Sequence, residues 1–119
     1  STKITDSHCH LDFDDARAEY IDRAVGAGVH RMVTICTRLK NEPNVRAIAE
    51  EFAPVFYAAG THPMSAAQEP LTSVEELCGM AKHPKMVGIG ETGLDYHYTA
   101  DTALVQKQSL TYQIKRTGF

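Results

Sequence analysis

The sequence predicts an α/β protein with a parallel sheet, and in particular the first four units of a (β/α)8 barrel of the TIM-barrel type. Short β-branched runs alternate with stretches that have helical spacing of apolar residues. Polar side chains recur just past the end of each predicted strand, 27, 25 and 29 residues apart, at His10, Thr37, His62 and Glu91. Because a barrel of about 250 residues has roughly 31 residues per unit and gathers its chemistry at these strand ends, the spacing favours a barrel over an open sheet.

The predicted strands are short, apolar and bounded by polar residues or glycine, as expected for buried parallel strands. The first covers residues 3–6. The next three are RMVTIC, PVFYAAG and KMVGIG, at residues 31–36, 54–60 and 85–90. Their parallel arrangement requires a crossover after every strand, and the helix patterns between them supply it.

A helix pattern follows each predicted strand, over residues 14–28, 42–52, 71–83 and 99–119. Pro43 suits the first turn of the second helix, and Thr72 is the expected N-cap of the third. We expect the first two helices to bury, respectively, Ala16, Tyr20, Ala24 and Val25, and Val45, Ile48, Ala49 and Phe52.

The chain length corresponds to one domain, residues 1–119, that holds half of a barrel. Four units make half of the eight that close the sheet, and the sequence stops where a fifth strand is due. We therefore expect the remaining strands to be absent from this sequence. A half sheet leaves two open edges, which predicts association with a second copy or with the missing C-terminal half.

Composition and charge narrow the function classes. The net charge is −3, which argues against a broad basic nucleic-acid surface but allows a small site where bound cations grip phosphates. Cys9, Cys36 and Cys78 are far apart and form no CxxC pair, so we expect buried free thiols in a reducing, cytoplasmic compartment. No apolar run approaches the about 20 residues that cross a bilayer, and we expect no signal peptide and no membrane partner.

The stretch TDSHCHLDF places His8 and His10 two positions apart at the end of the first strand. Residues i and i+2 of a strand point to one side, so the imidazoles are expected to project together, away from Cys9. Two neutral imidazoles make half of a site for zinc or a similar divalent ion. Asp6 or Asp12 is the expected acceptor for the second ring N–H of a ligating histidine. A hydrogen-bonded pair of histidines without metal is the alternative.

Glu91, in GIGETGLDY, follows the fourth predicted strand among glycines that allow a close approach of backbone and ligand. A carboxylate at this edge can bridge two metal ions, although a helix N-cap or a turn residue is the alternative. His62 is expected either to contact a phosphate or to hold the shape of its loop. Asp95 and Tyr96 are expected to line the substrate pocket, Tyr96 by stacking on a base, and packing within the loop is the alternative. His30 and His83 lie in the opposite loops, and we expect them to be solvated.

The segments DSHCHLDF, AAGTHPMSA and VGIGETGLDYHY, in this order, resemble the motifs of the TatD-related deoxyribonucleases. The segment VQKQSLTYQIKRTGF is similar to the family's fourth helix, so the resemblance covers essentially the whole chain. These proteins are metal-dependent hydrolases with a (β/α)8 barrel. The resemblance implies that the substrate and partner is DNA, whose phosphodiester bonds are hydrolysed, often from an end.

The resemblance implies two divalent ions in a complete site, Mg²⁺, Mn²⁺ or Zn²⁺. It assigns His8 and His10 as ligands of one ion and Glu91 as the bridging carboxylate. The family's other ligands, two histidines and an aspartate, lie on later strands. That aspartate is expected to act as general base on the attacking water, so the base is expected outside this sequence.

Two alternatives to a deoxyribonuclease stay open. One is a related metal hydrolase that acts on a small ester, lactone or amide, since the wider superfamily shares the His-x-His pair. The GETGLDY segment favours the nuclease branch, because relatives with other chemistry often carry a lysine there. The other alternative is a truncated fragment that is inactive alone.

Overall fold

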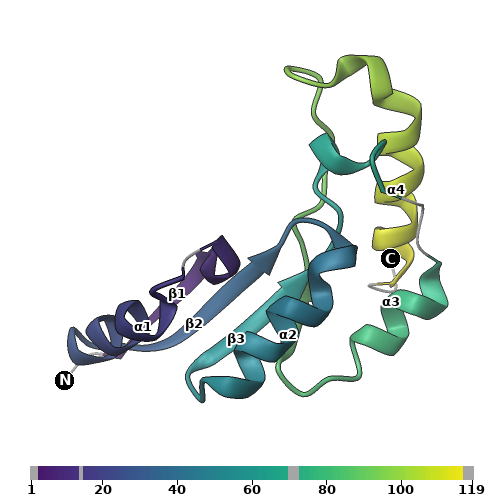
Figure 1. The fold of residues 1–119 in the computed structure, drawn as a ribbon. Coiled ribbons are helices and arrows are strands. Elements are labelled where there is room, and N and C mark those ends of the chain that lie inside the picture. Colours follow the sequence, from purple (N-terminus) through teal and green to yellow (C-terminus); the bar gives the residue numbers. More distant parts are fainter. Residues whose placement is uncertain (1–2, 14, 70–72, 117–119) are drawn as a thin grey trace.

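A computed structural model describes residues 3–13, 15–69 and 73–116, and within them the chain forms a four-stranded parallel sheet (Figure 1). The strands are β1 (Ile4–Cys9), β2 (Val29–Cys36), β3 (Val55–Ala59) and β4 (Met86–Ile89). They pair in chain order, β1–β2–β3–β4, and every pair is parallel. The predicted α/β class and its alternation of strands and helices are therefore confirmed.

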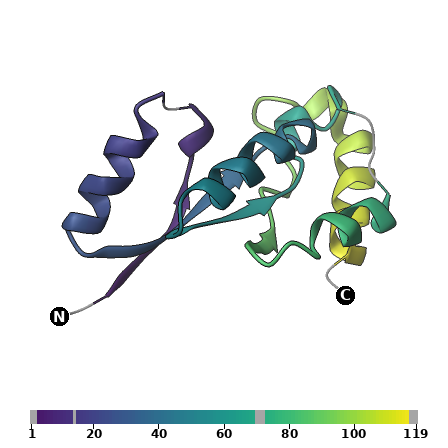
Figure 2. The ribbon, with the colours of Figure 1, turned by 60° about the horizontal axis from the view of Figure 1, so that its bottom comes forward.

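Each described strand is followed by a short 3-10 turn and then by a helix. The helices are α1 (Arg17–Gly26), α2 (Glu42–Glu51), α3 (Val74–Met80) and α4 (Ala103–Arg116). Helices α1 and α2 cover one face of the sheet, whereas α3 and α4 pack against each other on the β4 side (Figures 1 and 2). The opposite face of the sheet corresponds to the inside of the predicted barrel.

The core lies between the sheet and α2. Alternate residues of β2 and β3 face the helices and are fully buried: Met32, Thr34, Cys36, Val55, Tyr57 and Ala59. They meet the apolar side of α2, where Val45, Ile48 and Ala49 are buried as predicted. Thr34 is polar, but its hydroxyl accepts a hydrogen bond from the Leu11 backbone N–H (3.0 Å), which holds the turn after β1 against the sheet.

Each end of α2 is stabilised by a suitable residue. Pro43 lies in the first turn, where its missing N–H costs no hydrogen bond. At the other end, Lys85 Nζ donates to the carbonyl oxygens of Ala49 (2.5 Å), Phe52 (3.0 Å) and Ala53 (3.1 Å). A positive charge suits the carbonyl end of a helix. Burial lowers the pKa of Lys85, and the hydrogen bonds to these carbonyls offset part of the cost of burying its ammonium group.

Several predicted details differ from the structure. Strand β1 continues to Cys9 instead of ending at residue 6, which brings His8 into the strand. Helix α1 buries Ile21, and Ala24 packs partly buried against the core, whereas the predicted core residues Ala16, Tyr20 and Val25 are exposed. The N-cap of α3 is Ser73, whose hydroxyl accepts from the Glu76 N–H (3.1 Å). The predicted cap Thr72, and the helix ends at 14, 71 and 117–119, lie outside the described residues.

The expectations for the cysteines and for His30 and His83 are met only in part. Cys9 and Cys36 are buried, as predicted, whereas Cys78 is exposed. His83 is not simply solvated: its Nε2 lies 2.9 Å from Glu50 Oε1. His30 belongs to β2, and its Nδ1 donates to the Ile4 carbonyl (2.9 Å). Within the described residues, no helix has both the length and the hydrophobicity that crossing a bilayer demands.

Candidate metal centre

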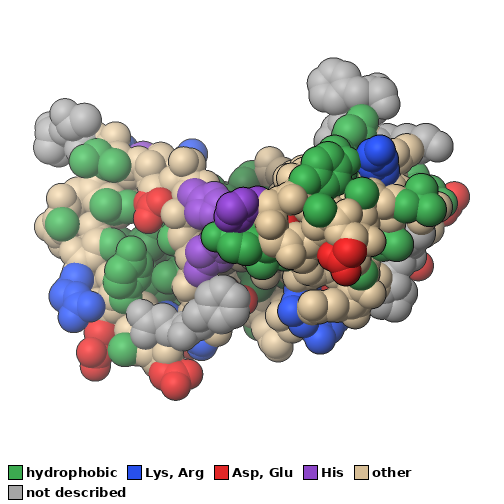
Figure 3. Space-filling view, turned by 90° about the horizontal axis from the view of Figure 1, so that it is seen from above, with side chains coloured by type: hydrophobic (Ala, Val, Ile, Leu, Met, Phe, Trp, Pro, Cys, Tyr) green, Lys and Arg blue, Asp and Glu red, His purple; other side chains and the backbone are tan. Residues whose placement is uncertain are grey.

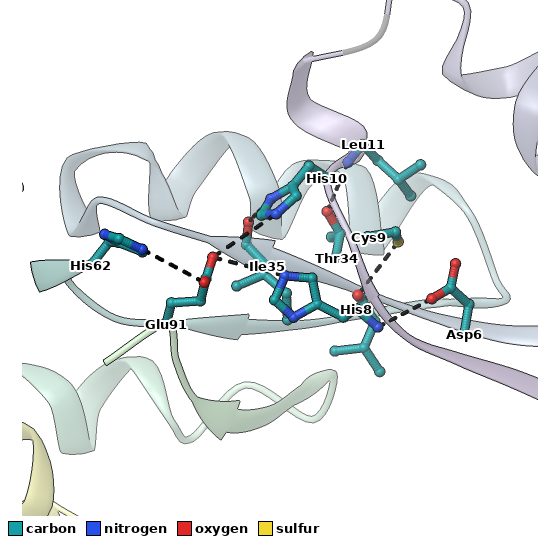
Figure 4. Close-up of polar contacts among 10 residues, drawn as sticks. Asp6, His8, Cys9, His10, Leu11, Thr34, Ile35, His62 and Glu91 are labelled. Carbon is teal, nitrogen blue, oxygen red and sulfur yellow. Dashed lines mark hydrogen bonds and ion pairs between the residues drawn. The ribbon is translucent and has the colours of Figure 1, made fainter. Parts of the chain in front are cut away.

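His8, His10 and Glu91 converge at the carboxyl end of the sheet (Figure 4). One ligand atom from each lies within 4.8 Å of the others. Glu91 Oε2 is 3.8 Å from His8 Nε2 and 3.9 Å from His10 Nε2. In the space-filling view of this end, histidine side chains gather where the surface is hollowed (Figure 3). Strands β1 and β4 are the two edges of the described sheet, so the inward curve of the sheet brings their ends together.

The His-x-His pair is positioned by the strand itself. The ring centroids of His8 and His10 are 5.1 Å apart, in an edge-to-face arrangement. Cys9, between them, points the other way into the core, and its thiol donates to the Val33 carbonyl (3.4 Å). Burial raises the pKa of Cys9 to about 11, so it stays a protonated thiol at neutral pH. The predicted separation of the two faces is confirmed.

The tautomer of His10 is set by a backbone carbonyl. His10 Nδ1 lies 3.3 Å from the Ile35 oxygen, which can only accept, so Nδ1 carries the proton. The Nε2 lone pair is then presented toward Glu91, as metal coordination requires. The Ile35 carbonyl is thus the acceptor for the second ring N–H of His10, the role that we predicted for Asp6 or Asp12. Asp6 instead accepts from the backbone N–H of His8 (3.1 Å), and Asp12 Oδ1 is buried with no hydrogen-bond partner among the described residues.

His62 is brought to the same cluster with the opposite tautomer. Its Nδ1 accepts a hydrogen bond from the Met64 backbone N–H (3.1 Å), which can only donate, so the ring proton lies on Nε2. That Nε2 is 3.8 Å from Glu91 Oε1. The two oxygens of Glu91 therefore face different sides, Oε2 toward the His-x-His pair and Oε1 toward His62. His62 is equipped to donate a hydrogen bond, whereas His10 is equipped to coordinate a metal.

Glu91 and His62 are positioned by contacts between distant segments. Gln113, buried on α4, accepts from the Thr61 N–H (2.9 Å) and donates to the Thr61 carbonyl (3.4 Å). Gly60 leaves no room for a side chain, because a Cβ there would lie 2.6 Å from Gln113 Oε1 and 3.0 Å from the Gly90 carbonyl carbon. The Gly90–Glu91 peptide bond is cis. The ends of β3 and β4 are thus held close to each other and to α4.

Glu69 joins the turn after β2 to the loop after β3, and the sequence reasoning missed it. Its carboxylate accepts from the backbone N–H groups of Leu39 (2.9 Å) and Lys40 (3.2 Å) and from the Thr61 hydroxyl (2.5 Å). The backbone N–H of His62 donates to the Thr37 carbonyl (2.8 Å) between the same two segments. A single glutamate in a polar loop gives no periodic signal, so only the three-dimensional contacts reveal this role.

Asp95 organises the loop that precedes α4. Its Oδ2 accepts from the Thr99 hydroxyl (2.7 Å) and from the backbone N–H groups of Thr99 (2.8 Å) and Tyr98 (3.1 Å). These hydrogen bonds, the Thr99 hydroxyl first, hold the pKa of Asp95 below its usual value. Buried Gln106 bridges the Asp95 backbone from α4. The adjacent Tyr96 is exposed. That Asp95 and Tyr96 contact substrate stays a prediction.

The chain's fold and site define half of a β/α barrel with a candidate metal centre at its strand ends. The chain belongs to the TatD related DNase family, whose model matches residues 5–117. It is 32% identical over 118 residues to "Uncharacterized metal-dependent hydrolase YcfH" of Escherichia coli K12, covering 94% of this chain and 44% of the relative. It is 35% identical over 103 residues to "3'-5' ssDNA/RNA exonuclease TatD" of Cronobacter turicensis, covering 87% of this chain and 39% of that relative.

A solved structure supports the same conclusion. The crystal structure of YjjV, a TatD homologue from Escherichia coli K12, superposes with a TM-score of 0.82 at 30% identity. The match covers 96% of this chain and 46% of YjjV. The chain therefore spans less than half the length of the relatives that it matches. The predicted half-barrel fold class and the resemblance to the TatD family are confirmed.

Proposed function

We propose that the chain forms the N-terminal half of a divalent-metal-dependent hydrolase that cleaves phosphodiester bonds in DNA. The observation that carries the proposal is the environment of Glu91. Its Oε2 faces the imidazoles of His8 and His10, and its Oε1 faces His62. A carboxylate with its two oxygens turned to different sides is suited to bridge two ions, and we propose two ions in the complete site.

The donor set fits a divalent ion. Two imidazole nitrogens and a carboxylate are ligands that Zn²⁺ and Mn²⁺ accept, while Mg²⁺ prefers oxygen donors. Ligand atoms about 2.1 Å from a tetrahedral ion lie about 3.4 Å apart. The Nε2–Oε2 separations of 3.8 and 3.9 Å therefore need to shorten by only about half an ångström. Zn²⁺ or Mn²⁺ is the proposed ion at His8 and His10.

Different residues of this chain have different proposed roles in binding metal and substrate. His8, His10 and Glu91 would hold the divalent ions, which would supply Lewis-acid stabilisation of a phosphate and activation of water as the nucleophile. His62, whose Nε2 carries the ring proton, would donate a hydrogen bond to an oxygen of a phosphate at the metal centre. Asp95 keeps the loop that carries Tyr96 in place, and Tyr96 is exposed and available to stack on a base. The general base is proposed to lie on the later strands of the family's barrel.

Nucleic acid is the proposed substrate because of the family and the names of its members. The Cronobacter relative is named an exonuclease of single-stranded DNA and RNA, while YcfH is named only a metal-dependent hydrolase. Because this chain spans less than half of either relative, we propose that the working site includes the rest of the barrel. The open edges β1 and β4, with exposed Ile4 and Val87, are the proposed surfaces for that half or for a second copy.

Metal binding and cleavage are tested separately. Calorimetric titration with Zn²⁺ and Mn²⁺ is expected to show binding that Glu91→Gln weakens on the order of 100-fold, while Glu19→Gln on exposed α1 leaves it unchanged. An end-labelled single-stranded oligonucleotide is then incubated with Mn²⁺ or with EDTA. Metal-dependent cleavage that disappears in Glu91→Gln supports the nuclease. Hydrolysis of p-nitrophenyl acetate but not of the oligonucleotide would instead favour the small-ester alternative.

The oligomeric state tests the need for a second half. Sedimentation velocity at several concentrations is expected to show a dimer if two copies close the sheet. A monomer that binds metal but does not cleave the oligonucleotide would contradict self-association and leave the activity to the longer barrel.

A further inference from the structure

A groove with a volume of about 690 Å³ opens beside the His–Glu cluster. Its walls carry the cluster residues His10, His62 and Glu91 together with two cationic residues, Arg38 and Lys40. A groove of this size accommodates a ligand of nucleotide dimensions and exceeds what a lone phosphate needs. The metal centre and the two cations thus belong to one continuous surface.

Arg38 is held in the groove by uncharged partners. Its Nε donates to the Ser65 hydroxyl (3.2 Å) and its Nη2 donates to Gln68 Oε1 (2.7 Å). By contrast, Arg46 pairs with the carboxylate of Glu42. The partners of Arg38 fix the guanidinium without neutralising it, and the guanidinium has further N–H donors for an anion. A guanidinium that is oriented by neutral partners, with no ion pair among the described residues, is suited to recognise a phosphate in two-point contact.

The turn that carries both cations is rigidly attached to the site. Glu69 accepts from the backbone N–H groups of Leu39 and Lys40, and also from the Thr61 hydroxyl, one residue before His62. These donors are neutral, and within the described residues no ion pair joins Glu69 to Arg38. The contacts link the cations to the same loop that positions His62. The distance between the cations and the metal centre is therefore set by the fold.

We propose that Arg38, assisted by Lys40, binds a second phosphate of a single-stranded nucleic acid, next to the phosphate held at the metal centre. The proposal deepens the proposed function and rests on it for the position of the first phosphate. Successive phosphates of a strand carry successive charges, so two spaced cationic sites select a polynucleotide over an isolated phosphate. In a chain of net charge −3, a local pair of cations is what makes this groove attractive to a polyanion.

The test measures binding without cleavage. Fluorescence anisotropy of fluorescein-labelled (dT)5 is recorded in EDTA, with KCl varied from low to moderate concentration. Arg38→Gln is expected to weaken binding about tenfold or more and to reduce the slope of log K against log[KCl] by about 0.7, the value of one contact on a single strand. Lys40→Gln, an exposed side chain, is expected to weaken binding about threefold. Arg23→Gln on exposed α1 is the matched control and should bind like the wild type.

The results that would contradict the proposal are specific. Equal affinity and slope for Arg38→Gln and wild type, or no binding by wild type, would overturn it. Inorganic phosphate that displaces the probe as well as unlabelled (dT)5 does, at equal phosphate concentration, would overturn it in favour of a lone anion site. If Arg38→Gln alone unfolds, by circular dichroism, Lys40→Gln decides the matter. Binding of (dT)5 is measured in EDTA and metal affinity by separate calorimetric titration, so failure of the metal chemistry is distinguished from failure of this site.

Discussion

The two sides of the candidate metal centre are built in different ways. On β1, His8 and His10 face the same side because a strand alternates, and one backbone carbonyl orients the His10 ring. On the other side, Glu91 and His62 depend on α4, on the loop after β3 and on the absence of a side chain at Gly60. The first side is local in sequence and the second is assembled over long range. A substitution at a histidine of the first side should therefore remove a candidate metal ligand. A substitution in the contacts that hold the second side should instead displace one.

The strongest test of this comparison is His10→Ala. Loss of an imidazole ligand is expected to weaken Zn²⁺ binding on the order of 100-fold or more, because structural zinc sites gain several kcal/mol from each ligand. The fold should persist, since the His10 side chain is only partly buried. Calorimetric titration and thermal unfolding measure the two effects. His30→Ala, at the opposite end of the sheet, is the control. Unchanged zinc affinity in His10→Ala would remove β1 from the site.

Gly60→Ala should damage the long-range side by moving Glu91. The new Cβ would clash with Gln113 Oε1 and the Gly90 backbone, and such overpacking costs about 1–3 kcal/mol. We expect a lower urea midpoint together with weaker metal binding. Gly79→Ala, in α3 with open space around its Cα, is the control and should be neutral or slightly stabilising. A Gly60→Ala variant with wild-type stability and metal affinity would contradict the proposed coupling of β3 and β4.

Gln113→Leu removes the contact of α4 with Thr61 while keeping an apolar side chain of similar size. It leaves the buried Thr61 N–H without its acceptor, which costs about 1–2 kcal/mol. Gln108→Leu, exposed on the same helix, should have little effect. Urea unfolding compares the two variants. If both lower stability equally, the effect belongs to the helix surface and not to the Thr61 contact.

The smallest expected effect is at Asp95, and it depends on pH. The folded pKa of this carboxyl is lowered, so its hydrogen bonds stabilise the fold above pH about 4 and the contribution is lost as pH falls through the lowered pKa. Asp95→Asn should therefore lower the urea midpoint at pH 7 and lower it less at pH 3. Asp101→Asn, exposed in the next turn, is the control. An equal decrease at both pH values would show that the charge of Asp95 is not involved.

The local features of the fold were accessible from the sequence. The strand and helix order follows from the alternation of apolar runs with helical spacing, and the buried face of α2 follows from Val45, Ile48 and Ala49. The shared face of His8 and His10 follows from strand geometry alone. In each case the signal lies within one element, so no knowledge of tertiary contacts is needed.

The features that escaped prediction depend on partners distant in the sequence. Glu69 and Gln113 are polar residues without periodicity, and their roles arise only when separate loops meet. The hydrogen-bond acceptor of the His10 ring is a backbone carbonyl of β2, and no side-chain type in the sequence identifies such an acceptor. Helix α1 buries Ile21, whereas Tyr20 and Val25 of the predicted face are exposed, and helical spacing alone does not identify which of them meets the sheet. Tertiary packing, in these cases, overrides local preference.

The sheet order β1–β2–β3–β4 also has a consequence for biosynthesis. Each strand pairs with the strand translated just before it, so the sheet can grow vectorially from its first edge as the nascent chain leaves the ribosome. Glu91 is translated 81 residues after His10, roughly 4–16 s later at ordinary elongation rates. The three candidate metal ligands of this chain, His8, His10 and Glu91, therefore come together only once the fourth strand has docked.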